Sequence, residues 1–208
     1  MYDTIVIKSP EIDQDCVTDL LKFCTLAEGL DICTGELLYT FTSGKLEGSY
    51  DYRIRFKVDN TEWVKEEDDR VPVRVESYWH IVVECSLHKI MMNHNVYGGP
   101  CNIHGSVKYL VNMLEELSGV KLPNYLDWQV KRIDVSKIFK FDNRNICKKI
   151  SSNLDNTYFA RREIRKFGTS VMFTGSTTTC KIYWKGPEFK KHDYKRVMKY
   201  INKEVDLN

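Results

Sequence analysis

The chain has 208 residues, of which 42% are hydrophobic and 29% are charged, a composition typical of a soluble protein with a core of its own. It contains no apolar run of about 18 residues, and its start, MYDTIVIKSPEID, has neither the cationic nor the apolar region of a secretory signal, which argues against a membrane-spanning or secreted protein. The formal net charge of +2 hides an asymmetry, because residues 1–100 carry 10 Lys/Arg against 18 Asp/Glu and residues 101–208 carry 21 against 11. The basic half indicates a nucleic-acid partner.

The first half of the chain is predicted to be mostly β-structure. Residues 2–8 alternate polar and apolar side chains, which predicts a strand with one buried face. Ser9-Pro10-Glu11 is a helix start signal, and apolar residues recur at near-helical spacing up to Cys24. Three further stretches have strand character, at residues 35–44, 49–59 and 71–87. The acidic stretch Glu62–Arg70 is expected to be a solvated loop between the last two.

The second half is predicted to mix helices and strands. Residues 105–118 place apolar side chains at i, i+3, i+4, i+7 and i+10 and are followed by Gly119, the pattern of an amphipathic helix with a glycine cap. The other expected elements are a strand at 128–141, helices at 143–154 and 158–168, strands at 169–175 and 177–186 joined by a turn, and a last helix at 189–204. Strands and helices without regular βαβ alternation indicate an α+β fold with a mostly antiparallel sheet. No linker divides the sequence, so we expect a single domain over residues 1–208.

Seven cysteines are scattered along the chain without a Cys-x-x-Cys pair. Neither a disulfide framework nor a zinc site fits an odd number at this spacing. We interpret them as reduced thiols of a cytosolic protein, mostly small residues that fill the core. They are Cys16, Cys24, Cys33, Cys85, Cys101, Cys147 and Cys180.

Acidic residues in or beside apolar strands are the first candidates for a functional site. Glu84 follows three apolar residues, Asp134 lies in the strand VKRIDVSKIF, and Glu188 follows the last strand. Buried strand carboxylates are unfavourable unless they bind a cation, and together with the imidazole of His94 they would suit Mg²⁺ or Mn²⁺. The alternative is that each carboxylate pairs with a nearby basic residue such as Arg132 or Lys185.

Tyr183 and Lys185, in the segment KIYWKG, are a second candidate. A tyrosine hydroxyl can attack a phosphodiester and form a covalent phosphotyrosine when a metal polarises the phosphate. A lysine two residues further along a strand points to the same face, where it would stabilise the phenolate or the phosphorus centre. The alternative is an ordinary aromatic core strand that carries a lysine.

Basic residues that would hold a DNA strand cluster on two predicted helices. Phosphate contacts of this kind give salt-sensitive affinity without sequence information. The candidates are Arg161, Arg162, Arg165 and Lys166 on the helix at 158–168, and Lys190 and Lys191 on the last helix. Each cluster alone is equally typical of a solvated helix face.

Three segments, in order, resemble the replication initiators of filamentous phages and related phage and plasmid elements, the gene II/X family. They are VVECSLHKIMMNHNVYG at 82–98, VKRIDVSKIF at 130–139 and STTTCKIYWKGPEF at 176–189, and the opening YDTIVIKSPEID is also similar to the family's first strand. Asn93 stands where family members usually have glycine, and His80 and His88 do not form the His-x-His pair of many other rolling-circle initiators. Family members continue beyond the tyrosine segment, so we expect a short member, a nuclease domain or a derivative that only binds DNA.

The resemblance implies an origin-specific endonuclease built on a ferredoxin-like palm, an antiparallel sheet with helices packed on one face. Tyr183 would nick one strand and rejoin it through a covalent 5′-phosphotyrosine, with Lys185 beside it, to start rolling-circle replication. The implied ligands of Mg²⁺ or Mn²⁺ are Glu84, Asp134, Glu188 and His94. The implied partners are single-stranded or cruciform origin DNA and host replication proteins such as a helicase, in the cytoplasm of a bacterial host. The alternative is a non-catalytic DNA-binding regulator derived from an initiator.

Overall fold

Two compact units, Met1–Ser136 and Lys137–Asn208, make up the computed structural model of the chain. The single domain expected from the sequence stays a prediction. The structure describes residues 1–30, 37–46, 54–65, 74–92, 99–141, 143–154, 156–167, 170–190, 194–195 and 198.

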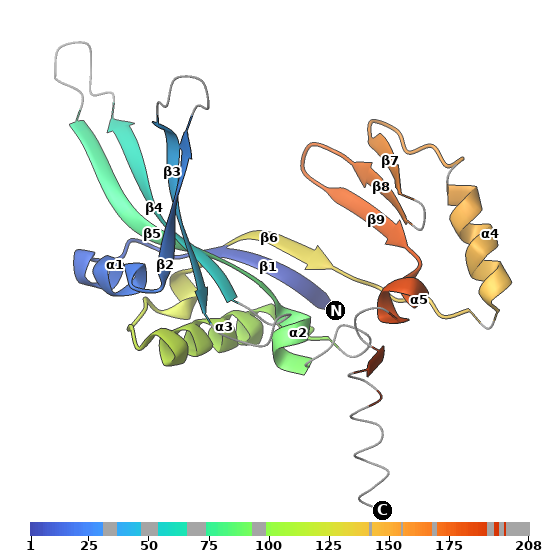
Figure 1. Ribbon diagram of the computed structural model, residues 1–208, viewed down its shortest axis with the longest axis horizontal. Coiled ribbons are helices and arrows are strands. Elements are labelled where there is room, and N and C mark those ends of the chain that lie inside the picture. Colours follow the sequence, from blue (N-terminus) through green and yellow to red (C-terminus); the bar gives the residue numbers. More distant parts are fainter. Residues whose placement is uncertain are drawn as a thin grey trace, which may run out of the picture. The chain divides into compact units, whose positions relative to one another are not determined.

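The first unit is built on a six-stranded sheet in which all neighbouring strands are antiparallel. The strand order is β2-β3-β4-β5-β1-β6 (Figure 1). The strands are β1 (Tyr2–Lys8), β2 (Cys24–Leu30), β3 (Leu37–Leu46), β4 (Ile54–Lys65), β5 (Arg74–Ser86) and β6 (Gln129–Val135). The helices are α1 (Gln14–Leu21), α2 (Leu87–Met92), α3 (Ile103–Ser118) and the 3₁₀ turn η1 (Tyr125–Asp127).

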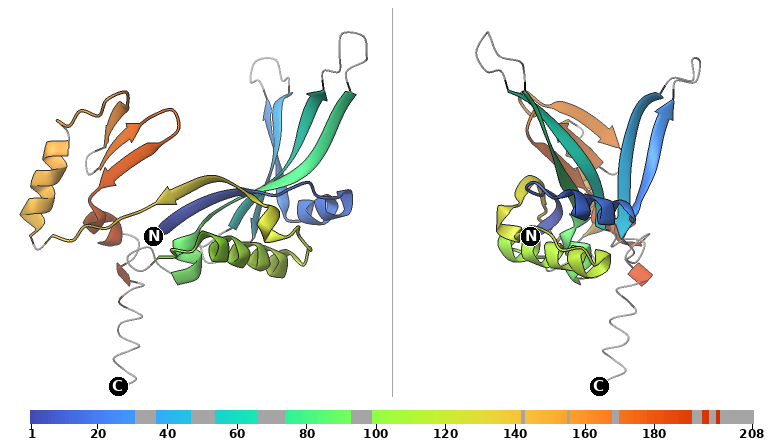
Figure 2. Two further views of the ribbon diagram at one scale, coloured as in Figure 1. Left: turned by 180° about the vertical axis from the view of Figure 1, so that it is seen from behind. Right: turned by 90° about the vertical axis from the view of Figure 1, so that its left-hand side faces the viewer.

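Four of these strands and two helices form the expected ferredoxin-like palm. Along the chain they follow one another as β1, α1, β4, β5, α3 and β6, and in the sheet their order is β4-β5-β1-β6, which is the β-α-β-β-α-β arrangement of that fold. The hairpin β2-β3 is inserted between α1 and β4 and extends the sheet at one edge. Both helices cover the same face of the sheet (Figure 2). The predicted fold class, α+β with helices on one face of an antiparallel sheet, is confirmed.

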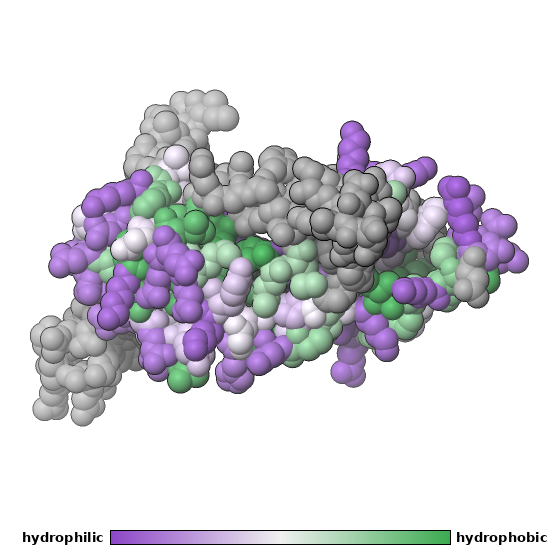
Figure 3. Space-filling view, turned by 90° about the horizontal axis from the view of Figure 1, so that it is seen from below, coloured by the Kyte–Doolittle hydropathy of each residue, from purple (hydrophilic) through white to green (hydrophobic). Residues whose placement is uncertain are grey.

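The core of the first unit lies between the sheet and its helices. Successive side chains of a strand point to opposite faces, so β1 buries Ile5 and Ile7 completely while Val6 between them faces away from the helices. The helix α3 buries Leu110 and Leu114 to 0% exposure against the same cluster. The outer side of the helical layer is largely hydrophilic in Figure 3. Leu117, which the spacing also placed on the apolar side of the helix, is 45% exposed.

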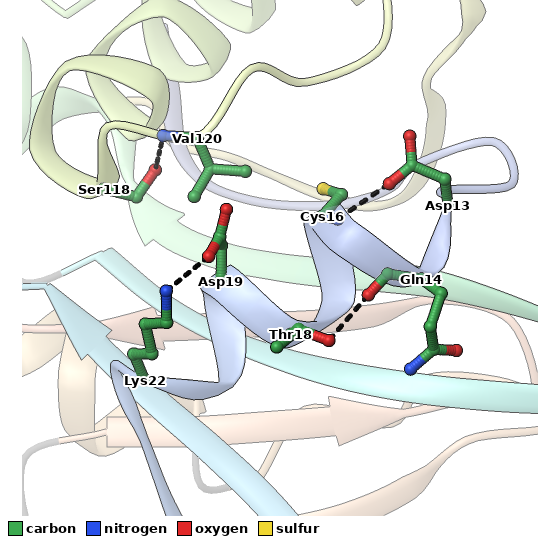
Figure 4. A network of polar contacts seen from close by, with 8 residues as sticks. All are labelled: Asp13, Gln14, Cys16, Thr18, Asp19, Lys22, Ser118 and Val120. Carbon is green, nitrogen blue, oxygen red and sulfur yellow. Dashed lines mark hydrogen bonds and ion pairs between the residues drawn. The ribbon is translucent and has the colours of Figure 1, made fainter.

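The helix α1 is held at both ends by acidic side chains (Figure 4). Asp13 caps its N-terminus, because Oδ1 accepts a hydrogen bond from the backbone N–H of Cys16 at 2.7 Å. Near its C-terminus Lys22 pairs with Asp19. Burial, followed by these two carboxylates, raises the pKa of the Cys16 thiol to about 11.

Fewer of the described cysteines are buried in the core than the sequence predicted. Burial, with a contribution from Glu84, raises the pKa of the Cys85 thiol to about 12, and since the thiolate is the reactive form, Cys16 and Cys85 are inert core residues. Among the described residues, however, only these two cysteines are buried. The remaining described ones are partly buried or exposed: Cys24, Cys101, Cys147 and Cys180. Cys33 lies outside the described residues.

A glycine lets the hairpin β2-β3 join the palm. Gly44 of β3 faces Phe56 of β4, and a Cβ at position 44 would overlap the ring of Phe56. The ring therefore covers backbone that a side chain would otherwise occupy, as aromatic residues do beside glycine in other sheets.

In the part of the second unit that the structure describes, a three-stranded antiparallel meander is accompanied by two helices. The sheet order is β7-β8-β9, and the turn between β8 and β9 is closed by a hydrogen bond from Gly175 N–H to the carbonyl of Thr178 at 2.9 Å. The predicted helix at 143–154 is confirmed. The predicted final strand pair is confirmed too, except that its second strand ends at Tyr183 and does not reach residue 186. The elements are α4 (Arg144–Leu154), β7 (Glu163–Phe167), β8 (Ser170–Thr174), β9 (Thr179–Tyr183) and α5 (Lys185–Glu188).

Three other expectations about the elements are wrong. The helix expected at 158–168 is a turn followed by β7, which pairs with β8. The strand expected at 128–141 ends at Val135, and residues 136–141 form neither helix nor strand. The acidic stretch expected to be a loop begins inside β4, which continues to Lys65, while residues 66–70 lie outside the described part of the chain. None of the described helices is long and apolar enough to span a membrane.

Packing on α3 can be tested with two leucines on the same helix. We expect Leu110→Ala to lower the free energy of unfolding by about 2–5 kcal/mol, because a fully buried side chain is replaced by a cavity. Leu117→Ala, at 45% exposure, should change it by less than about 1 kcal/mol. Urea unfolding followed by circular dichroism measures both; equal losses would contradict this description of the core.

Candidate active site

The sheet face of the first unit opposite the helices carries a row of charges across four strands. Arg55 of β4 faces Glu84 of β5, Glu84 faces Val6 of β1, and Val6 faces Arg132 of β6. All three charged residues are exposed. The residues on either side of Arg55 and of Glu84 are buried in the core on the other face of the sheet. We call this face the open face of the palm.

Arg132 brings two of the predicted metal ligands together. Its Nε and Nη2 donate to the two carboxylate oxygens of Asp134 at 2.8 and 2.6 Å, and its Nη1 lies 3.9 Å from Oε1 of Glu84. The hydrogen bond to Asp134, followed by the charges of both carboxylates, raises the pKa of the Arg132 guanidinium. In the structure these two carboxylates therefore pair with Arg132, which is the alternative that the sequence analysis left open.

Tyr183 is the last residue of β9. The residue is 43% exposed. The ammonium groups of Lys181 and Lys185 lie 5.7 and 6.0 Å from the centre of its ring. In the register of the sheet Lys181 faces Met172, which faces Arg165, so strand alternation places Arg165 on the same face as Tyr183. Lys181 and Arg165 were missed as neighbours of Tyr183, although the spacing Lys181-x-Tyr183 in a strand would have shown the first.

The four arginine and lysine residues expected on one helix do not share a face. Arg162 donates to the carbonyl and Oγ1 of Thr178, both at 2.6 Å, and thus holds the β8–β9 turn. Arg165 pairs with Glu163 at 2.9 and 3.2 Å. Lys166 follows Arg165 in β7 and so points to the other face of the meander. Arg161 is exposed and has a left-handed backbone, with φ of 59°.

The residues after Tyr183 are only partly described. The sequence predicted that Lys185 continues the strand, but it is the first residue of α5. Its ammonium group approaches the ring of Tyr183 from that helix. Glu188 ends α5, and its side chain lies outside the described part of the structure. Lys190 is exposed, whereas His94 and Lys191 lie outside the described residues. The last helix, expected at 189–204, also lies mostly outside them.

A comparison with protein families identifies the family of the chain. A family model described as the N-terminal part of the phage replication-associated protein of the gene II type matches residues 1–207. The chain belongs to this phage family. The resemblance read from the sequence is thereby confirmed, and a role in phage replication follows from membership in the gene II family. Searches of curated proteins and of solved structures found no match.

The residues on the open face of this gene II-family chain supply part of a site for a divalent cation. Glu84 and Asp134 supply hard oxygen atoms, the ligand type that Mg²⁺ and Mn²⁺ prefer, and both carboxylates already surround one positive group, Arg132. Within the described ranges no group of three or more His, Cys, Asp and Glu side chains gathers in a way that would hold a metal. The open face of the palm thus offers two ligands, and Arg132 occupies the place between them.

A histidine beside this row lies almost buried in the palm. His80 of β5 is 3% exposed and faces Asp59 of β4. Its ring centre lies 5.5 Å from that of Tyr78, whose hydroxyl accepts a hydrogen bond from Lys8 Nζ at 3.0 Å. Burial, followed by the positive charge of Lys8, lowers the pKa of His80. No local sequence pattern indicates this cluster, since its members come from three strands.

The lowered pKa of His80 predicts how stability depends on pH. Below about pH 6.5 the unfolded chain binds a proton at this histidine that the folded chain still excludes, so stability falls as pH decreases through this range. We expect His80→Gln to flatten that decrease, and Lys8→Gln to flatten it in part, because burial remains. Urea midpoints across the range measure this in all three proteins. Parallel curves would show that His80 does not contribute.

Proposed function

We propose that this chain starts phage replication by nicking one strand of origin DNA through Tyr183 and later rejoining it. Membership in the gene II family of replication-associated proteins supports this role. The observation that carries the proposal is the setting of Tyr183, an exposed tyrosine at a strand end with two ammonium groups within about 6 Å of its ring. Origin DNA, single-stranded or in a cruciform, and host proteins such as a helicase are the partners in this proposal.

In the proposed reaction the oxygen of Tyr183 attacks the scissile phosphorus. A bond forms between that oxygen and phosphorus, and the bond from phosphorus to the 3′ oxygen breaks. The phenolic proton leaves the tyrosine and a proton is gained by the 3′ oxygen, so the products are a 5′-phosphotyrosine and a free 3′ hydroxyl. Rejoining is the reverse, in which the 3′ hydroxyl attacks the phosphotyrosine.

The basic side chains near Tyr183 have a part in this chemistry. An unperturbed tyrosine loses its proton only near pH ~10, so positive charges that favour the phenolate make attack easier. Lys181 and Lys185 would supply these charges. Arg165, on the same face, would hold the DNA phosphates, for which it must leave Glu163.

A divalent cation, Mg²⁺ or Mn²⁺, is part of the proposal. When bound it would polarise the phosphate as a Lewis acid. Glu84 and Asp134 would hold it, with Glu188 and His94 as the further ligands expected from the sequence. Arg132 must then release both carboxylates, because a guanidinium and a cation carry like charge.

The nucleophile can be tested with tyrosines of the same unit. On a supercoiled plasmid carrying the phage origin, with Mg²⁺ or Mn²⁺, we expect Tyr183→Phe to abolish nicked circles and the protein-linked 5′ end. Tyr158→Phe and Tyr194→Phe, at 80% and 46% exposure in the parent, should nick as the parent does. Nicking by Tyr183→Phe would show that the nucleophile is wrong. A parent that binds the origin and nicks with neither cation would instead favour a DNA-binding replication regulator.

Competition between Arg132 and the cation gives a second test. Removal of one exposed charge about 4 Å from a site is worth about 1 kcal/mol, so we expect Arg132→Gln to bind Mn²⁺ about fivefold more tightly than the parent. Titration followed by electron paramagnetic resonance of free Mn²⁺ measures the affinity without DNA. Adding Asp134→Asn to Arg132→Gln should remove the gain, and Lys57→Gln, an exposed cation paired with Asp59 elsewhere on the face, should leave affinity unchanged. Unchanged affinity in Arg132→Gln would place the cation elsewhere.

A further inference from the structure

The first residues of the second unit expose an unusual run of side chains. The segment Lys137-Ile138-Phe139-Lys140-Phe141 forms neither helix nor strand. Phe139 is 68% exposed and Phe141 is 46% exposed. The ammonium group of Lys137 lies 5.3 Å from the centre of the Phe139 ring. We call these five residues the basic-aromatic strip.

Core packing does not account for the strip. Among the described residues of its unit, the buried apolar ones are Val171 and Phe173 of β8, and the two phenylalanines of the strip stay in contact with water instead. Single exposed apolar residues are common on protein surfaces. Two rings within three residues, each next to a lysine and with no acidic residue in the run, are instead typical of a surface that binds both flat rings and negative charge.

We propose that the basic-aromatic strip binds unpaired DNA. Bases would stack on the rings of Phe139 and Phe141, and phosphates would pair with Lys137 and Lys140. Single-stranded DNA offers base faces and phosphates together, whereas a duplex hides the base faces inside its stack. Lys137 already lies over a ring, so it can stay beside that ring while it contacts a phosphate on a stacked nucleotide.

The strip lies near Tyr183 along the chain path. Phe141 is three residues from Arg144, so their Cα atoms are at most about 11 Å apart. The guanidinium of Arg144 lies 5.2 Å from the ring of Trp184, which directly follows Tyr183. A strand bound to the strip would thus be held close to the proposed nucleophile. The biological role of the strip rests on the proposed function, but its affinity for DNA does not require nicking.

The test separates base stacking from apolar docking. We would measure fluorescence anisotropy of labelled oligodeoxythymidine in a Tyr183→Phe background, which removes the proposed reaction. We expect Phe139→Leu and Phe141→Leu each to weaken binding roughly 5- to 100-fold, because leucine keeps the apolar surface and loses the stacking ring. Phe139→Tyr should retain parental affinity. Tyr109→Leu, a control on α3 that is 38% exposed in the parent, should also bind as the parent does.

The lysines give an independent readout. Lys137→Gln and Lys140→Gln should each reduce the slope of log affinity against log salt by about 0.7. An oligonucleotide carrying iodouracil, irradiated in the complex, should crosslink to a peptide that contains Phe139. Circular dichroism confirms that each variant keeps the parental fold.

Three results would overturn the proposal. The first is parental affinity in both leucine variants, and the second is crosslinking confined to other peptides. The third is a loss of self-association in Phe139→Leu with unchanged DNA affinity, which would make the strip a contact between copies of the chain. A failure of the parent to nick, with the expected anisotropy results, would remove the proposed function and leave the strip as a DNA-binding surface.

Discussion

The two-residue repeat of side chains along β1 is the constraint on which the palm depends. This strand lies between β5 and β6, and Ile5 and Ile7 anchor it in the core at 0% exposure. A shift by one residue would expose both isoleucines to water and turn Val6 inward. The hydrophobic effect therefore fixes which face of β1 is buried. The pairing of Val6 with Glu84 on one side and with Arg132 on the other places these two charged residues within reach of each other across β1.

The sequence predicted the palm well because its strands and α3 carry regular patterns. β7 was mistaken for a helix for a physical reason. Arg and Lys are good helix formers, and Ile164 and Phe167 are spaced as on a helix, yet pairing of Ile164 with Phe173 of β8 decides the structure. Tertiary contacts of this kind override local preference. For the same reason Arg162, expected on DNA, holds a turn of its own unit.

The candidate site was predictable as a set of residue types and not as a set of contacts. Glu84 and Asp134 stood out because carboxylates in apolar strands need partners. Their meeting at Arg132 depends on β1 lying between β5 and β6, which no local pattern contains. His80 shows the same limit, since its surroundings come from β1, β4 and β5. Spacing along one strand was the relation that the sequence could supply directly, as between Arg132 and Asp134 or between Lys181 and Tyr183.

The hairpin β2-β3 has a consequence for how such a chain can diversify. It joins the sheet beyond β4, at the edge away from β1 and β6, so changes in it leave the strands that carry Glu84 and Arg132 in place. Its attachment is restricted mainly where Gly44 lies under the ring of Phe56. Changes of surface at this edge would therefore not require any change in β5, β1 or β6.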